Sequence, residues 1–343
     1  MKKSLLALAA LTAFAGVASA QSSVTLFGVV DLGIRAVDNE NGARTTLTQD
    51  GNASSRLGFR GVEDLGGGLR AGFWLEAGVN PDIGGTNMTT VGGNSVSQLF
   101  NRRSTVSLMG GFGELRLGRD YTPTFWNHTV FDPFGTNGVG SQTNLMVGAA
   151  ATPTLVRANN TIGYFLPAMG GLYGQLQIGL DEGDQAGNDV GYAGGRIGYA
   201  AGPVNFAVAY AETKPPVGSP TIKATNVGGS FNFGFMTLMG QYHEYKAGSA
   251  KMNNVLLGAT VPMGGGTFKF SAAQSELNSA GKPKAIQLAA GYVYDLSKRT
   301  ALYAHVSSID NDTGIAARVP GGKTNGGAGI TSSGYELGLR HSF

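Results

Sequence analysis

Alternation of large apolar residues with small or polar ones recurs along most of this chain. Its last segment is a clear example, in which Tyr335, Leu337, Leu339, His341 and Phe343 alternate with Glu336, Gly338, Arg340 and Ser342. Successive side chains of a β-strand point to opposite faces, so the segment predicts a strand with one apolar and one polar face. In a membrane barrel this strand would pair with the first strand, because an open sheet edge cannot lie in lipid. From these residues alone, an ordinary strand of a soluble sandwich remains the alternative.

The connections between the predicted strands alternate between short and long. Short turns are expected at 64–68, 110–113, 167–171, 201–203, 232–234, 262–266 and 295–299, and longer polar connections at 37–53, 80–97, 120–156, 181–189, 212–222, 245–250, 276–284 and 310–331. Bacterial outer-membrane barrels have an even number of strands, short periplasmic turns and longer outer loops. The pattern therefore predicts an all-β fold: a 16-stranded antiparallel transmembrane β-barrel, with strands of about 9–12 residues. A helical fold is disfavoured by the 56 glycines.

The first twenty residues have the features of a cleaved bacterial signal peptide. A basic start, Met1-Lys2-Lys3, precedes an apolar stretch up to Val17 and the small-residue site Ala18-Ser19-Ala20. We therefore expect residues 1–20 to be removed and residues 21–343 to form a single barrel domain exported to the outer membrane. The chain has no cysteine, so closure would depend on hydrogen bonds instead of disulfides. A formal charge of +3 is too small to indicate nucleic-acid binding.

The third long connection, from Asp120 to Val156, is longer than a barrel hairpin needs. Long segments without regular structure usually have a function. This one is rich in apolar and aromatic residues: Tyr121, Phe125, Trp126, Phe131, Phe134, Leu145 and Met146. We expect it to fold into the lumen, where Asp120 and Asp132 would add negative charge at the narrowing. A cap over the outer mouth or a contact within a trimer are the alternatives.

Arginines of the predicted strands are expected to face the lumen. An arginine facing lipid near the midplane would cost roughly 2–4 kcal/mol. Alternation places Arg56 and Arg60 opposite the apolar Leu57 and Phe59, and it places Arg70 on the face of Trp74 and Glu76. Of the adjacent Arg102 and Arg103 one is expected to point inward, and Arg157 opens the strand after the long loop. For Arg35 and Arg119, a lumen position and a headgroup position are equally open.

Several stretches together resemble the trimeric general-diffusion porins of Gram-negative outer membranes, in particular the beta-proteobacterial type. They include 23–31, 55–66, 69–78, 100–103, 110–119, 132–135, 294–300 and 338–343, in order along nearly the whole chain. The resemblance implies sixteen strands, a homotrimer and a third loop inside the lumen. It also implies that Arg56, Arg102 and Arg157 form the arginine cluster of the constriction, and that Phe343 is the signal read by the barrel-assembly machinery.

The resemblance has one departure, at the tip of the third loop. Here the tip is Asp132-Pro133-Phe134-Gly135, whereas enterobacterial relatives have Pro-Glu-Phe-Gly, so the acidic position is offset. The expected constriction wall is Arg56, Arg60, Arg70, Arg102 and Arg157, opposed by Asp120 and Asp132. Opposite charges across a pore make a transverse field, which favours small polar solutes.

The expected function is passive diffusion of small hydrophilic solutes and ions, with a weak preference for anions, as in many family members. The expected surroundings are outer-membrane lipid and lipopolysaccharide. No cofactor, metal site or enzymatic activity is expected: His128, His243, His305 and His341 are scattered and are expected at the rim or girdle. The alternatives are a substrate-selective porin for a sugar or organic acid, and a structural or adhesive outer-membrane protein.

Overall fold

The computed structural model describes residues 23–40, 42–86, 88–91, 94–147, 152–181, 191–215, 219–323 and 327–343. The predicted signal peptide, 1–20, lies outside the described residues. Among those described, no helix combines the length and the apolar character needed to cross a bilayer.

Strands dominate the described chain. They are β1 (Ser23–Asp38), β2 (Ala43–Gln49), β3 (Arg56–Gly66), β4 (Leu69–Asn80), β5 (Gly85–Thr86), β6 (Met88–Val91), β7 (Asn94–Ser97), β8 (Arg103–Gly110), β9 (Gly113–Tyr121), β10 (Arg157–Phe165), β11 (Leu172–Gly179), β12 (Gly191–Ala201), β13 (Val204–Lys214), β14 (Ile222–Asn232), β15 (Thr237–Ala247), β16 (Ala250–Met263), β17 (Gly266–Leu277), β18 (Lys284–Asp295), β19 (Thr300–Asn311) and β20 (Ser332–Ser342). A helix, α2 (Pro123–Val130), and a 3-10 turn, η1 (Gln142–Leu145), lie between β9 and β10.

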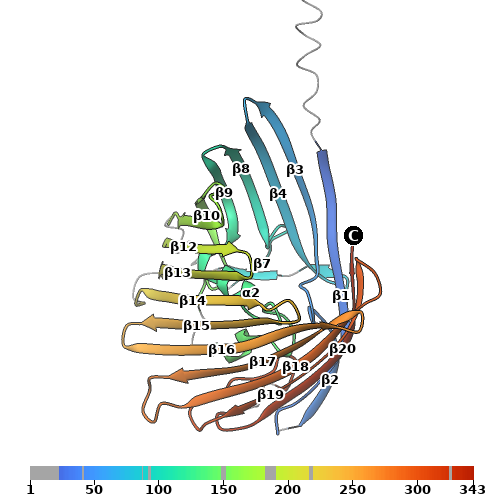
Figure 1. Ribbon diagram of the computed structural model, residues 1–343. Coiled ribbons are helices and arrows are strands. Elements are labelled where there is room, and N and C mark those ends of the chain that lie inside the picture. The colour runs from blue at the N-terminus through green and yellow to red at the C-terminus, as the bar shows by residue number, and fades with distance from the viewer. Residues whose placement is uncertain are drawn as a thin grey trace, which may run out of the picture.

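Each wall strand pairs antiparallel with its neighbours, and the sheet closes on itself (Figure 1). The closure is between β1 and β20, where Val29 pairs with Ser342 and Asp38 with Ser333. Of the eighteen strands in the sheet, β2 continues the line of β3 beside β1, and β5 is a short extension next to β4. The wall therefore has sixteen strands, as the sequence predicts.

The two faces of the wall differ as the alternation requires. On the outer face the side chains of Leu176, Leu257 and Leu288 are 65%, 58% and 61% exposed. On the inner face Asn254 and Gln287 are buried beneath the third loop. Exposed aromatic residues gather on the outside near the short turns: Phe112, Tyr199, Phe231, Phe233, Phe235, Tyr294 and Phe343. Such a girdle is typical of a barrel at the membrane surface.

The alternation of connections follows the prediction, with three differences. The segment expected to be a loop at 80–97 contains β5 and the hairpin of β6 and β7. The connection expected to be long at 245–250 is a tight turn at Gly248-Ser249 between β15 and β16. The segment expected to be a loop at 37–53 contains β2, which pairs along β1 from Leu32 to Asp38. The six residues between β2 and β3 leave the ladder and turn inward, because the Asp31 carboxylate accepts hydrogen bonds from the backbone N–H groups of Gly51, Asn52 and Ala53. A single buried carboxylate thus replaces the missing ladder bonds.

The third loop folds into the lumen, as predicted. Helix α2 contacts β11, β12, β13 and β14, and η1 contacts β17 and β18. Glycines on the inner face of the wall make room for two loop side chains: the Phe131 ring lies on Gly228, and the Pro133 ring lies on Gly258. The Asn127 amide donates hydrogen bonds to Asn226 Oδ1 (2.7 Å) and to the carbonyl of Ala207. The loop is therefore fixed to the wall by packing and by hydrogen bonds.

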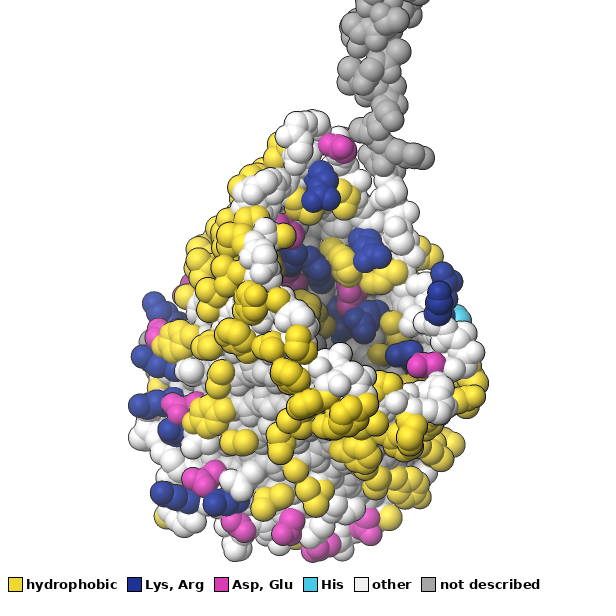
Figure 2. Space-filling view, in the orientation of Figure 1, with side chains coloured by type: hydrophobic (Ala, Val, Ile, Leu, Met, Phe, Trp, Pro, Cys, Tyr) yellow, Lys and Arg dark blue, Asp and Glu magenta, His cyan; other side chains and the backbone are white. Residues whose placement is uncertain are grey.

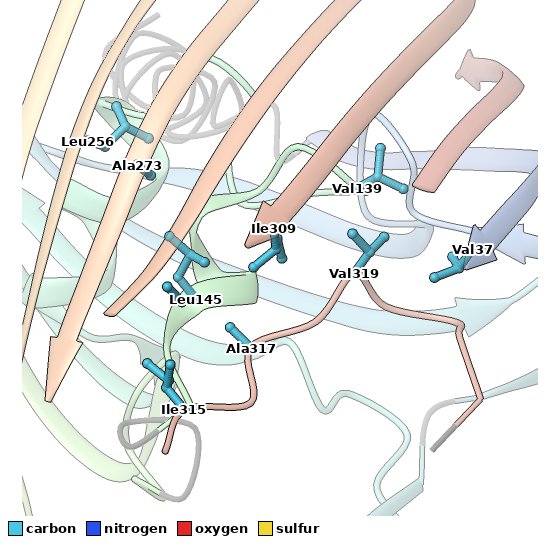
Figure 3. Packing of buried hydrophobic residues seen from close by; sticks show 10 residues of the cluster. Val37, Val139, Leu145, Leu256, Ala273, Ile309, Ile315, Ala317 and Val319 are labelled. Atoms are coloured by element: carbon cyan, nitrogen blue, oxygen red, sulfur yellow. The ribbon is translucent and has the colours of Figure 1, made fainter. Parts of the chain in front are cut away.

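The connection between β19 and β20 also folds inward, which the sequence analysis did not predict. Ile315, Ala317 and Val319 are buried against Val139 and Leu145 of the third loop (Figure 3). The Asn311 side chain holds this connection by accepting from the N–H of Ala317 and donating to its carbonyl. The result is an apolar core inside the barrel, on the side of β16 to β19 and the end of β1.

We predict that Gly228→Ala loosens the third loop. A Cβ built at Gly228 overlaps the ring of Phe131, so the ring has to move, at a cost of about 1–3 kcal/mol. Thermal unfolding of the purified protein in detergent should show a lower midpoint, and a protease should cut the loop faster. Gly240→Ala is the control, because its Cβ meets nothing closer than 3.6 Å. Equal midpoints for the two variants would contradict the packing described here.

Candidate functional site

Three arginines meet on the inner wall where β3, β8 and β10 begin, next to the third loop. The Glu76 carboxylate accepts a hydrogen bond from Arg102 Nε at 2.6 Å, and Arg56 Nη1 lies 3.7 Å from the same oxygen. The Tyr121 hydroxyl accepts from Arg102 Nη2 (2.7 Å) and Arg157 Nη2 (2.8 Å). This arginine cluster, Arg56, Arg102 and Arg157, is therefore brought together as the resemblance implies.

The arginine cluster carries more positive than negative charge and is held rigidly. Arg56 and Arg102 share the carboxylate of Glu76, and the half-buried Asp50 adds a second negative charge near both. Arg157 stacks on the Tyr121 ring, with its guanidinium carbon 4.4 Å from the ring centroid, and donates from Nε to the carbonyl of Arg102. Arg56 donates from Nε to the carbonyl of Ser54 in the inward-turned segment after β2. The guanidiniums are thus fixed by neighbours that neutralise only part of their charge.

A second basic layer lies next to the cluster, on β8 and β9. Arg116 forms ion pairs with Glu114 (2.8 Å) and Asp120 (2.6 Å), and Arg103 lies 3.6 Å from Asp120. Arg103 and Arg102 both turn to the lumen side, whereas the sequence analysis expected only one of the pair to do so. The reason is that Arg102 precedes the regular part of β8, so strand alternation does not apply to it.

The other predicted arginines lie further toward the short turns. Arg60 is exposed and lies over the rings of Phe27 and Trp74, four residues along β3 from Arg56. Arg70 is exposed, and its backbone is paired with that of Asp64 close to the turn between β3 and β4. Arg56 pairs with Gly78 of β4, and Gly78 lies eight residues along that strand from Arg70. The arginine cluster and Arg70 are therefore about 26 Å apart along the strand direction. These two residues do not belong to the same layer as the arginine cluster.

Both predicted acidic residues are buried, with 1% of Asp120 and 4% of Asp132 exposed. Asp120 pairs with Arg116 and Arg103, as described above. Asp132 accepts hydrogen bonds from the backbone N–H groups of Phe134 (2.8 Å) and Gln142 (3.0 Å), which closes the third loop on itself. Burial raises the pKa of Asp132 to about 6 against these hydrogen bonds and the nearby Lys269. The carboxylate therefore serves the loop's own structure.

Three of the four histidines are interior, not at the rim or girdle as expected. His128 of α2 and His243 of β15 are buried and stack with ring centroids 3.7 Å apart, and His128 Nε2 lies 2.6 Å from the Tyr245 hydroxyl. Burial lowers the pKa of His128 to about 3. His305 Nδ1 lies 3.1 Å from the Glu336 carboxylate. Strand alternation puts His243 and His305 on the polar face of their strands, which is the signal in the sequence for their interior position.

Glu336 is the second anchor of the third loop, and sequence reasoning missed it. Its buried carboxylate accepts from the N–H of Val139 and pairs with Arg35 Nη2 at 2.7 Å. Arg35 is therefore a lumen residue and not a headgroup residue. Strand alternation places Arg35 and Glu336 on the polar face, but only the pairing of β1 with β20 makes them neighbours.

The comparisons with known proteins agree with this geometry. A family model described as "Gram-negative porin" matches residues 7–314. The chain is 41% identical to outer membrane porin protein 32 of Delftia acidovorans, over all of both chains. It is 32% identical to an outer membrane porin protein of Bordetella pertussis, over 91% of this chain and 95% of the relative. The structure resembles that of an anion-selective porin from Comamonas acidovorans, with a TM-score of 0.82 and 38% identity, over 94% of this chain and 100% of that one.

We predict that Asp132 makes the stability of the protein depend on pH. Its carboxyl binds a proton below about pH 6 in the folded protein but only below about 3.8 when unfolded. Between pH 3.8 and about 6 the folded state therefore binds more protons than the unfolded state. The stabilisation that the protonated Asp132 provides is fully present below pH 3.8 and is lost as pH rises through about 6. It amounts to at most about 3 kcal/mol.

Thermal unfolding in detergent between pH 4.5 and 7.5 measures this effect. Asp132→Asn should unfold at a lower temperature throughout, because it keeps one acceptor oxygen for two N–H groups, and its midpoint should vary less with pH. If the native protein and the variant show the same pH slope, Asp132 is not the group responsible.

Proposed function

The chain belongs to the family of Gram-negative porins, and we propose that its lumen is a water-filled path for small hydrophilic solutes and ions with a preference for anions. The protein lies in the outer membrane and functions as a porin. Passage through such a lumen is passive diffusion, and the proposal assigns it no enzymatic step.

The arginine cluster carries the proposed anion preference. Three fixed guanidiniums outnumber the two carboxylates near them, Glu76 and Asp50, so an entering solute meets a net positive charge on this wall. The interaction energy of two unit charges about 4 Å apart is about 1 kcal/mol in bulk water and about 4 kcal/mol at an effective dielectric constant of 20. Because a fixed guanidinium requires no reorganisation when an anion arrives, the cluster favours anions over cations of the same size. The solved porin from Comamonas acidovorans is anion-selective, which supports the same sign of selectivity for this chain.

The acidic residues have a structural role in this proposal, in place of the transverse field expected from the sequence. Asp120 is paired with two arginines, and Asp132 is enclosed by its own loop. The third loop and the β19–β20 connection occupy the side of the lumen toward β11 to β20. Solutes then pass along the opposite wall, which carries the arginines. Figure 2 supports this path, since Lys and Arg side chains line the hollow that opens on that side.

The protein is proposed to act as a homotrimer. On the outer face of β8 to β10, the half-buried Arg119 shares its side of the sheet with Leu117 and is hydrogen-bonded to Asn159. A neighbouring copy would shield this polar spot from lipid, where a charge is costly.

The mass of the purified protein in detergent, measured by light scattering, should correspond to three chains.

Two further partners are proposed from the outer surface. Ion pairs Lys223–Glu212, Lys251–Glu244 and Lys284–Glu276 form a band at the long-loop ends of the strands, at the level of the lipopolysaccharide phosphates.

At the other end, Phe343 is exposed and pairs through its backbone with Gly28, so its ring is available to the barrel-assembly machinery before closure.

We predict that neutralising the arginine cluster shifts ion selectivity toward cations. Arg56→Gln, Arg102→Gln and Arg157→Gln should each lower the anion-to-cation permeability ratio about threefold to tenfold, which corresponds to about 0.6–1.4 kcal/mol. The measurement is the reversal potential of single channels in a planar bilayer under a KCl gradient.

Arg299→Gln is the matched control, because Arg299 is exposed in the short turn between β18 and β19. It should leave the reversal potential unchanged. A native protein that inserts without conducting would refute the channel itself, whereas unchanged reversal potentials in all three variants would remove only the arginine cluster from the selectivity mechanism.

A further inference from the structure

A second hollow opens beside the path, nearer to the short turns than the arginine cluster. Its volume is about 350 Å³, and it is formed by β1, β3, β4, β8 and β9. The residues that matter here are Arg60, Val62, Trp74, Arg103 and Met109. Small-molecule sites are of this size and combine apolar lining with a few fixed polar groups.

Arg60 supplies a positive charge that the protein leaves unpaired. Its guanidinium carbon lies 5.1 Å from the centroid of the Trp74 ring and 5.4 Å from that of Phe27. Among the described residues, no carboxylate oxygen lies within 4.0 Å of it. The side chain is exposed and is held by ring stacking, so its N–H donors remain free for an anion.

Arg103 lies over the same indole, with its guanidinium carbon 4.5 Å from the Trp74 centroid. It shares the Asp120 carboxylate with Arg116, which makes the shorter contact of the two. The indole itself is fixed, because Trp74 Nε1 donates to Glu76 Oε2 at 3.0 Å. Arg60, Arg103 and Arg116 thus face two carboxylates, Glu114 and Asp120, which leaves the hollow with a net positive charge.

Apolar surface lies next to these charges. Val62 is 45% exposed, and Met109 is half-buried in the same hollow. Gly72 also lines it, and a Cβ there would meet the Met109 side chain, so the absence of one keeps the space open. A ligand that fits must therefore combine an anionic group with a compact apolar body.

We propose that this hollow is a subsite for small aromatic monocarboxylates, of which benzoate is the simplest probe. The carboxylate would bind the free N–H donors of Arg60, with Arg103 adding positive charge nearby, and the ring would lie against Val62 and Met109. The subsite rests on the proposed channel function, since it names a solute class for the same path. Binding has to be weak, because a solute that passes must also leave. A dissociation constant of about 1 mM, equivalent to about 4 kcal/mol, meets this requirement.

The intrinsic fluorescence of Trp74 tests the proposal without any transport measurement. The chain has two tryptophans, Trp74 and Trp126, so Trp126→Phe leaves the indole of the subsite as the only reporter. Titration of this parent protein in detergent with sodium benzoate, at constant ionic strength, should give a saturable change in the millimolar range. Arg60→Gln in the parent should weaken binding at least fivefold, and Arg299→Gln should not change it. Arg103→Gln is the second variant if Arg60→Gln does not fold.

Two reference solutes separate the contributions of charge and ring. Benzyl alcohol lacks the carboxylate and acetate lacks the ring, so both should bind at least fivefold more weakly than benzoate. Equal binding of acetate and benzoate, or an unchanged titration in the folded arginine variant, overturns the subsite. Chloride conductance of the parent protein in a bilayer tests the channel function separately. Conduction without saturable benzoate binding refutes only the subsite. Benzoate binding without conduction refutes only the channel.

Discussion

Closure of the hydrogen-bond ladder between β1 and β20 is the constraint on which the rest of the structure depends. In lipid, each unpaired backbone N–H or C=O costs several kcal/mol, so a sheet that crosses a membrane must have no open edge. Once the sheet is closed, alternation gives every strand one face toward lipid and one toward the lumen. Charged and amide side chains then have only the lumen available, which makes the interior polar before any function is considered.

A polar interior of this width has to be partly filled, and the chain fills it from one side. The third loop and the β19–β20 connection form an apolar core with Val37, Leu256 and Ile309 of the wall. Their hydrogen bonds use inner-face residues such as Asn226, Gln287 and Glu336. The opposite wall is left with its arginines. Positive charge along the path is thus a consequence of where the loops are anchored as well as of how many arginines the chain has.

Carboxylates in this lumen act mainly as structural acceptors. Asp31 replaces the ladder bonds of the segment after β2, Asp132 closes the third loop, and Glu336 ties that loop to β20. Each is buried and accepts from backbone N–H groups, which stabilises the ionised form where solvation is poor. Because these negative charges are used internally, the guanidiniums of Arg56, Arg102 and Arg157 are balanced only in part, by Glu76 and Asp50. This division of roles connects the folding of the loops to the proposed preference for anions.

The sequence by itself determined the barrel, its sixteen wall strands and the inward third loop, because two-residue alternation and loop length are local properties. The need of charged side chains to avoid lipid predicted a wider set that included Arg60 and Arg70, and only the family resemblance singled out Arg56, Arg102 and Arg157. Tertiary structure alone decided which charges meet. The pairing of Arg35 with Glu336 joins residues at opposite ends of the chain, and the stacking of His128 on His243 needs the exact position of α2. The burial of Asp132 and the inward turn of the β19–β20 connection also depend on packing between distant segments, which no local pattern encodes.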